Sequence, residues 1–210
     1  MGLDIMFYRV SHPRKQKKGE SLNDYLWDVK HKQDKDFAKE TKEFINDWLA
    51  KSNDIESKDV AFEIHQLYFN LKGKYFAYDF ELKALQVATT LKEVREWYKG
   101  VDWKYFSKPD AAYFRKVNSI YAYFSPRLVG EMCVVKKEDI LDIMSKATEV
   151  LKEHDEETSK ELLPTQSGFF FGSTDYDEWY YEDMVNILTE FGKLLKDWRD
   201  DDIVFVYMSW

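Results

Sequence analysis

The sequence is poor in the residues from which disulfides and metal sites are usually built. It has one cysteine, Cys133, four histidines and four prolines among 210 residues. A single cysteine excludes an intramolecular disulfide and a cysteine-based zinc site, and it suits a reducing cytoplasm. Because Cys133 lies in the alternating segment EMCVV, burial in a strand is favoured over a reactive thiolate.

The histidines are too widely separated to bind a metal from one helix. They lie 19, 34 and 89 residues apart, whereas HExxH-type zinc sites need two histidines one helical turn apart. His65 falls within an apolar helical pattern, which favours a packing role. No motif indicates a metal or another cofactor, so we predict that the protein uses none. The four histidines are His12, His31, His65 and His154.

Motifs for nucleophilic catalysis and phosphate binding are also missing. The segment QSGFFFGST carries Ser167 and Ser173 beside glycines, but not at the spacing of a G-x-S-x-G elbow. A P-loop needs lysine after its last glycine, and Gly172 is followed by Ser173 and Thr174. Because a dispersed set of acidic residues leaves no motif, a hydrolase or nuclease stays open as the least favoured alternative.

The sequence has no long apolar run, and its net charge is negative. No run approaches the ~20 residues that a membrane span needs, and the opening MGLDIMFYRV is too short and too charged for a signal segment. We therefore expect a cytoplasmic protein without a membrane partner. The net charge of −8 argues against a nucleic-acid partner, because phosphate-backbone binding needs clustered Lys and Arg.

Apolar residues follow both of the spacings that regular structure requires. A spacing of two predicts strands at Leu3–Val10, Glu131–Val135 and Asp202–Trp210, and Phe169–Phe171 fits a short buried strand. Spacings of three and four predict helices, whereas Tyr75–Phe80 fits either structure. The predicted helices are Asp36–Lys51, Val60–Leu71, Thr90–Gly100, Ser107–Phe124, Lys136–His154 and Asp177–Asp197.

Together these elements predict an α+β fold. We expect one domain, Met1–Trp210, with a small mixed or antiparallel sheet that holds the N- and C-terminal strands and is covered by four to six helices. A variable helical insert is expected at about residues 20–100. Two charged segments are expected at the surface: the acidic connector 153–161, and the loop Ser11–Glu20, which is either a mobile solvated loop or a contact for a small anion. The basic residues of that loop are Arg14, Lys15, Lys17 and Lys18.

The first candidate site lies in the predicted helix Ser107–Phe124. Its candidate residues are Arg115, Lys116 and Asn118; if the apolar stripe of the helix faces the core, Arg115 and Asn118 fall toward a flank. Arginine and asparagine side chains recognise carboxylate, phosphate and amide groups through paired hydrogen bonds. The alternative interpretation is that these are ordinary polar residues on the solvent-exposed side of a helix.

The second candidate site flanks the triple phenylalanine. Thr174 is expected to cap the following helix, with Asp177 or Glu178 near its N-terminus. The aromatic residues of the first turn exceed what one helix face requires, since the apolar face is complete from Met184 onward. Core packing, a protein interface and a ligand pocket at the helix N-terminus all stay open. The candidate residues are Thr165, Gln166, Ser167, Tyr176, Trp179, Tyr180 and Tyr181.

Three motifs resemble one family. They are the opening MGLDIMFYRV, the segment YFRKVNSIYAYF with its R-K-x-N pattern, and the passage LPTQSGFFFGSTDYDEWYYED at Leu163–Asp183. They are similar to an uncharacterised family of small phage and prophage proteins, and the resemblance covers the first ten residues and the chain from about residue 105. It implies a phage-related accessory protein in the cytoplasm of a bacterial host cell and assigns no active site.

We therefore expect a non-enzymatic binding protein that acts on a host protein or protein complex, such as a defence system. The alternative is a small-molecule binder in which Arg115 and Lys116 meet an anionic ligand, a nucleotide or a cyclic nucleotide, while aromatic side chains stack on its base. The sequence does not determine the oligomeric state.

Overall fold

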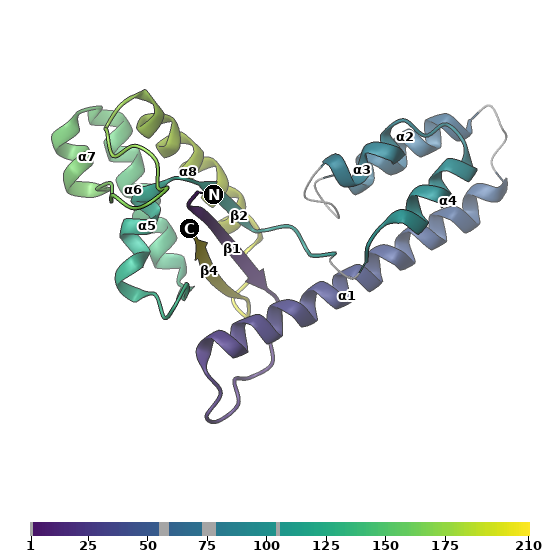
Figure 1. The fold of residues 1–210 in the computed structure, drawn as a ribbon, viewed down its shortest axis with the longest axis horizontal. Helices are drawn as coiled ribbons and strands as arrows, with labels where there is room; N and C mark the ends of the chain where they lie inside the picture. The colour runs from purple at the N-terminus through teal and green to yellow at the C-terminus, as the bar shows by residue number, and fades with distance from the viewer. Residues whose placement is uncertain (1, 55–58, 73–78, 104–105) are drawn as a thin grey trace. The chain divides into compact units, whose positions relative to one another are not determined.

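The computed structural model describes residues 2–54, 59–72, 79–103 and 106–210 (Figure 1). Its chain divides into two compact units: Met1–Val29 together with Asp110–Trp210, and Lys30–Pro109. Helix α1 (Leu22–Lys51) contributes to both units. The structure is a mixed α+β fold, as predicted, and the second unit covers much of the region expected as a helical insert.

The first unit contains one four-stranded antiparallel sheet. Its strands are β1 (Asp4–Val10), β2 (Ala112–Arg115), β3 (Met132–Val135) and β4 (Ile203–Ser209), in the order β2-β1-β4-β3. Strands β1 and β4 pair along their whole length, with Asp4 opposite Ser209 and Val10 opposite Ile203. The prediction that both terminal strands belong to one sheet is confirmed.

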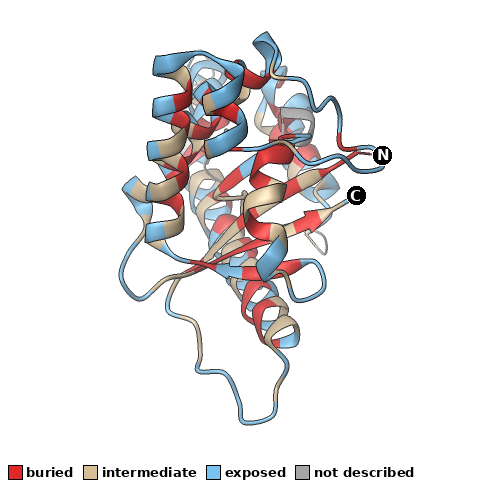
Figure 2. Ribbon diagram, turned by 90° about the vertical axis from the view of Figure 1, so that its left-hand side faces the viewer, coloured by how far each residue is buried: buried red, intermediate tan, exposed pale blue. Residues whose placement is uncertain are grey.

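Side chains on one face of this sheet form the main core. Ile5 and Phe7 of β1 point to this face, and the ring of Phe7 meets those of Phe114, Phe124 and Phe191 edge to face at 5.1–5.9 Å. Figure 2 shows buried residues along the strands and on the helix sides nearest to them. The helices of this unit that contribute to it are α5 (Asn118–Phe124), α6 (Lys137–Glu153), α7 (Glu156–Leu162) and α8 (Glu178–Asp197).

The other face of the sheet packs against the first turns of α1. Tyr8 and Val10 alternate with Phe7 along β1 and therefore point away from the main core. They join Leu26 of α1 and Phe205 of β4 in a smaller apolar cluster. The sheet is thus covered on both faces, which explains why β4 carries a nearly unbroken apolar run.

The second unit is helical in its described part. It contains α1 from Lys30 onward, the 3-10 turn η1 (Ser52–Asp54), α2 (Val60–Leu71), α3 (Asp79–Gln86) and α4 (Leu91–Gly100). Its core includes Ile45, Ile64, Leu67, Val94 and Trp97. The predicted capping box of α4 is present: Thr90 Oγ1 accepts from Glu93 N at 3.3 Å, and Glu93 Oε2 accepts from Thr90 N at 2.9 Å.

The predicted helix Ser107–Phe124 is wrong over its first half. Ala112–Arg115 forms β2, in which buried Ala112 and Phe114 alternate with exposed Tyr113 and Arg115. Lys116 N donates to Leu3 O at 2.8 Å, which extends the pairing with the N-terminal strand. The partner of this segment is more than 100 residues away, so no local signal in the sequence identifies it. Only α5, from Asn118, is helical, followed by the 3-10 turn η2 (Ser125–Arg127).

The predicted buried strand Phe169–Phe171 is also wrong. Phe171 N donates to Gly168 O at 3.2 Å, so these residues form a tight turn with Phe169 and Phe170 at its centre. A Cβ at Gly168 would lie 2.5 Å from Phe171 Cδ2, so only glycine fits there. Three adjacent phenylalanines carry no periodicity, and a turn that exposes two of them has the same sequence as a buried strand.

One further prediction changes, and another segment lies mostly outside the described residues. The expected acidic connector 153–161 contains most of α7, whose N-cap Asp155 accepts a hydrogen bond from Thr158 N at 2.9 Å. Tyr75–Phe80 lies mostly outside the described residues, and its last two positions, Asp79 and Phe80, begin α3.

No helix in the described ranges combines the length and apolarity that crossing a membrane requires.

The thiol of Cys133 should be unreactive in the native protein. It lies in β3, buried in the main core, and burial raises its pKa to about 11. We expect a thiol reagent such as DTNB to label Cys133 at pH 8 only as fast as the protein unfolds. The same reaction in urea is the positive control, and rapid labelling of the folded protein would contradict this placement.

Candidate functional site

The two segments singled out in the sequence lie side by side in the first unit. The loop between α7 and α8, residues 163–177, crosses the start of β1, where Leu3 N donates to Phe170 O at 3.4 Å. Asn118 Nδ2 donates to Ser173 O at 2.7 Å, and a Cβ at Gly172 would lie 3.4 Å from Lys116 Cβ. The loop therefore rests on the residues that join β2 to α5.

The turn at the tip of this loop exposes two phenylalanines. The side chain of Phe169 is 80% exposed and that of Phe170 is 44% exposed, with their ring centroids 4.3 Å apart. The next residue, buried Phe171, packs against Tyr121 of α5, and the rings of both residues contact exposed Trp210. We name this surface the aromatic patch and define it by Tyr121, Phe169, Phe170 and Trp210.

The backbone beneath the patch adopts conformations that side chains disfavour. Phe170 has φ +69° and Lys116 has φ +61°, in the left-handed region where glycine or asparagine is usual. Such residues cost of order 1–3 kcal/mol each and persist where the surrounding contacts determine them. Phe170 occupies the third position of the turn, where a left-handed φ is usual in one common turn type, and it is partly exposed at the tip.

Two cations lie beside the patch. A Cβ at Gly2 would lie 3.3 Å from Lys116 Cε and 3.8 Å from Arg115 Nη2, so both side chains pass the N-terminal end of β1. Both residues are exposed, and neither forms an ion pair with a carboxylate in the described ranges. In a chain of net charge −8 this local pair of cations is available to an acidic group on a partner.

Asn118, by contrast, has a structural role. Its side chain is buried, and its amide holds the carbonyl of Ser173 in the loop. The sequence predicted Arg115, Lys116 and Asn118 on one helix face. In the structure Arg115 ends β2, Lys116 is a linking residue with a left-handed φ, and Asn118 is the first residue of α5. The structure keeps the three near one another, although not by the helical geometry that the sequence suggested.

The polar residues before the turn organise the base of the loop. Thr165 N donates to Tyr176 Oη at 3.1 Å, and Thr165 Oγ1 donates to Thr174 O at 2.9 Å, which closes the loop across its two ends. Gln166 and Ser167 are exposed, and Gln166 Oε1 accepts a long hydrogen bond from Ser125 Oγ at 3.4 Å. Thr165 therefore stabilises the loop, whereas the exposed Gln166 and Ser167 lie next to the aromatic turn.

The aromatic residues of the first turn of α8 do not form one surface. Tyr180 is buried and donates to Leu163 O at 2.9 Å, and buried Tyr181 stacks on His154 at 3.8 Å. Tyr176 is half-buried, and Trp179 is exposed. The interpretation of Tyr180 and Tyr181 as core residues is thus the one that fits, and sequence spacing alone gave no reason to separate them from Trp179.

The N-terminus of α8 binds a group of its own chain. Its N-cap is Asp177, whose Oδ1 accepts from Tyr180 N at 3.2 Å, and not Thr174 as predicted. The carboxylate of Asp177 thus accepts from one of the backbone N–H groups that would otherwise be available at the helix N-terminus. The expected anion site at that position therefore has one donor fewer. No group of three or more metal-ligating side chains occurs among residues that the structure describes.

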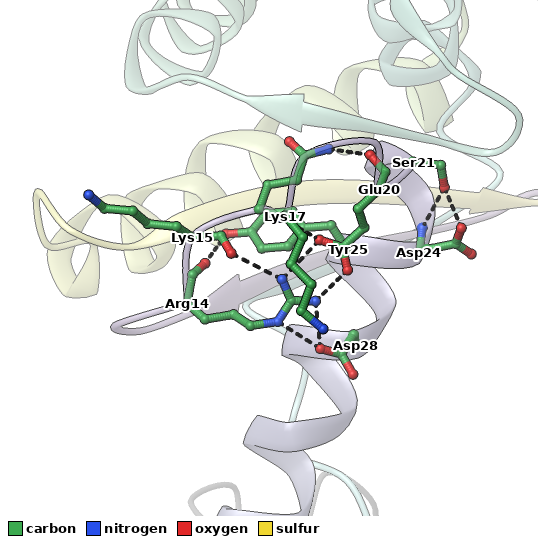
Figure 3. A network of polar contacts seen from close by, with 9 residues as sticks. Arg14, Lys15, Lys17, Glu20, Ser21, Asp24, Tyr25 and Asp28 are labelled. Atoms are coloured by element: carbon green, nitrogen blue, oxygen red, sulfur yellow. Dashed lines mark hydrogen bonds and ion pairs between the residues drawn. The ribbon is translucent and has the colours of Figure 1, made fainter.

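Hydrogen bonds and ion pairs of Arg14 hold the basic loop Ser11–Glu20 in place (Figure 3). Arg14 donates to both oxygens of Glu20 and to Oδ2 of Asp28 at 2.5–2.9 Å, while Tyr25 Oη donates to Arg14 O at 2.7 Å. The guanidinium lowers the pKa of Glu20 to about 2, helped by the backbone N–H of Lys17. Arg14 is therefore not available to an external anion.

Comparisons with known proteins find no match to this chain among family models, curated proteins or solved structures.

Asp183 should make stability fall with rising pH. Burial raises its pKa to about 6, and the charges of Glu182 and Asp177 add to the shift. A raised carboxyl pKa means that the ionised form is less favourable in the folded state, so stability is lost between about pH 4 and pH 6. We expect Asp183→Asn to be about 1–2 kcal/mol more stable above pH 7, after solvent screening is allowed for, and no more stable near pH 4.

Urea unfolding at several pH values measures this difference. The matched control is Glu182→Gln, which removes only a neighbouring charge and should give a smaller gain. Equal stability of Asp183→Asn and the parent protein at pH 7.5 would contradict the predicted penalty.

The Arg14 contacts should protect the basic loop from proteolysis. Replacing both acceptors, Glu20→Gln with Asp28→Asn, removes the ion pairs that hold the loop against α1. We expect faster tryptic cleavage after Arg14 and the lysines that follow it, because cleavage needs a locally open chain. Asp36→Asn, which breaks an exposed ion pair with Lys32, is the control and should not change the rate; equal rates for all three proteins would show that the contacts do not restrain the loop.

Proposed function

We propose that this chain is a non-enzymatic binding protein that acts on another protein through the aromatic patch. The observation that carries the proposal is the pair of exposed rings, Phe169 and Phe170, held at the tip of a turn in a disfavoured backbone conformation. Exposed aromatic residues next to a cation are the composition of protein-interface anchors. Their exposure costs free energy in the isolated protein, and a partner that covers them recovers it.

The cations define the kind of surface that the patch fits. Arg115 and Lys116 are free of ion pairs with carboxylates in the described part of the chain, and they flank the strand end on which the turn rests. A partner with an apolar cleft and an acidic rim would cover the rings and pair with both cations. The net negative charge of the chain repels an acidic partner from the rest of the protein surface. Charge therefore favours the orientation in which the acidic rim meets the two cations.

The resemblance to phage and prophage proteins supports a bacterial partner. Accordingly, we propose a host protein or protein complex as the target, with inhibition of a defence system as the kind of action that a phage-related protein performs. Nothing in this proposal requires a reaction, and the buried thiol of Cys133 fits a role without nucleophilic chemistry.

A small anionic ligand such as a nucleotide is the second candidate. The observation in its favour is the closeness of Arg115 and Lys116 to aromatic rings, which could stack on a base while the cations meet phosphate. The exposure of Phe169 favours a protein instead, because ligand pockets bury most of a small molecule and a turn that projects into solvent does not.

Photo-crosslinking in bacterial cells tests the proposal. A benzophenone amino acid in place of Phe169 should crosslink to one host protein, whereas the same group in place of Val185, an exposed residue on α8, should not. The affinity of the purified target is then measured for the parent protein and for Phe169→Ala with Phe170→Gly. We expect a loss of at least about 30-fold, because the two rings are the anchors.

The same variants separate binding from folding. Glycine relieves the left-handed φ at Phe170, so the double variant should unfold within about 1 kcal/mol of the parent protein. Val185→Ala is the matched control and should bind as the parent protein does. Undiminished affinity of the double variant would exclude the patch as the binding surface, and a thermal shift with nucleotides that is lost in Arg115→Ala would support the ligand instead.

A further inference from the structure

The outer face of α2, in the second unit, has an unusual composition. One third of the chain is charged, yet none of the six exposed residues of this helix carries a fixed charge. These six residues, which we name the outer α2 face, are Ala61, Phe62, His65, Gln66, Phe69 and Asn70. Helix α4 in the same unit shows the usual pattern, since five of its six exposed residues are charged; these are Lys92, Glu93, Arg95, Glu96 and Lys99.

Two phenylalanines make this face apolar. The side chain of Phe62 is 62% exposed and that of Phe69 is 56% exposed, although Ile64, Leu67 and Leu71 already fill the opposite face of the helix. The ring of His65 lies against Phe69, with centroids 4.7 Å apart. Residues 62, 65, 66 and 69 recur at spacings of three and four, which is the pattern that a second helix covers.

The order of residues on this face is nearly symmetric about its middle. Phe62 and Phe69 lie at equal distances from the point between His65 and Gln66, and Ala61 and Asn70 lie at equal distances outside them. When two such helices pack antiparallel about a two-fold axis at this point, each Phe62 meets the partner's Phe69. Each His65 likewise meets the partner's Gln66, with which it can form a hydrogen bond.

We propose that the outer α2 face binds a second copy of this chain, with the two α2 helices antiparallel. A two-fold interface requires a surface that is complementary to itself, and the symmetric order of the outer α2 face meets this requirement. Because the six exposed residues carry no fixed charge, the proposed contact places no like charges directly against one another. This inference does not use the aromatic patch and is independent of the function proposed above.

The expected dimer is weak. One 12-residue helix from each copy buries less than a standard interface, so we expect a dissociation constant on the order of 10–100 µM. Two phenylalanines from each copy provide most of the apolar contact. Replacing them with charged residues should therefore abolish association, and because both side chains are exposed, the fold should tolerate the change.

Sedimentation velocity over concentrations that span this range tests the association. The parent protein should shift from monomer to dimer, and Phe62→Glu with Phe69→Glu should remain monomeric throughout. Leu141→Glu, which charges an exposed apolar residue on α6, is the matched control and should dimerise like the parent protein. A parent protein that stays monomeric at the highest concentration, or a dimer that survives the double substitution, would overturn the proposal.

Crosslinking tests the antiparallel orientation. Because Cys133 is buried, an introduced cysteine is the accessible thiol of each variant, and the parent protein serves as the negative control. A mixture of Ala61→Cys and Asn70→Cys should crosslink with a short bis-maleimide, because position 61 faces the partner's position 70. Each variant alone should not, since equal positions lie about 13 Å apart along an antiparallel pair. Crosslinking of each variant alone, with no link between position 61 and position 70 found by mass spectrometry of the mixture, would show a parallel pair and overturn the inference.

Discussion

Pairing of the two terminal strands is the interaction on which the first unit depends. Strand β1 and strand β4 form the centre of the sheet, and each edge strand, β2 or β3, pairs with only one of them. Closing a loop between segments from opposite ends of the chain costs entropy, although this cost grows only slowly with loop length. Burial offsets it, because the sheet carries apolar side chains on both faces: the main core on one side and the cluster around Leu26 on the other.

The same pairing assembles the aromatic patch. When β1 enters the centre of the sheet, its first residues meet the end of β2 and the loop before α8, and Leu3 bonds to both Lys116 and Phe170. The ring of Trp210, just beyond β4, then reaches Tyr121 and Phe171. A surface made of three separate segments is therefore held by the backbone of one sheet, which suits a binding site that keeps its shape before a partner arrives.

Exposed phenylalanines mark two surfaces, and their surroundings differ. In the first unit, Phe169 and Phe170 lie near two cations that form no ion pair with a carboxylate in the described ranges, so charge as well as apolar area can select a partner. In the second unit, Phe62 and Phe69 lie on a helix face whose exposed residues carry no fixed charge, so apolar contact and hydrogen bonds between uncharged groups act there. The first arrangement suits a different protein with an acidic surface, and the second suits an identical chain, since the exposed residues of a symmetric face without fixed charge place no like charges against each other.

Local sequence patterns determined much of the fold. The spacing of apolar residues placed α2, α6 and α8 within a few residues, and the Thr90–Glu93 box placed the start of α4, because amphipathicity and capping act between residues close in the chain. Only the tertiary structure decided that Ala112–Arg115 is a strand, that Phe169 and Phe170 face solvent, and that Tyr180 and Tyr181 do not. Each of these outcomes depends on a partner distant in sequence, such as Leu3 for Lys116 or Leu163 for Tyr180, and periodicity within a segment carries no information about such a partner.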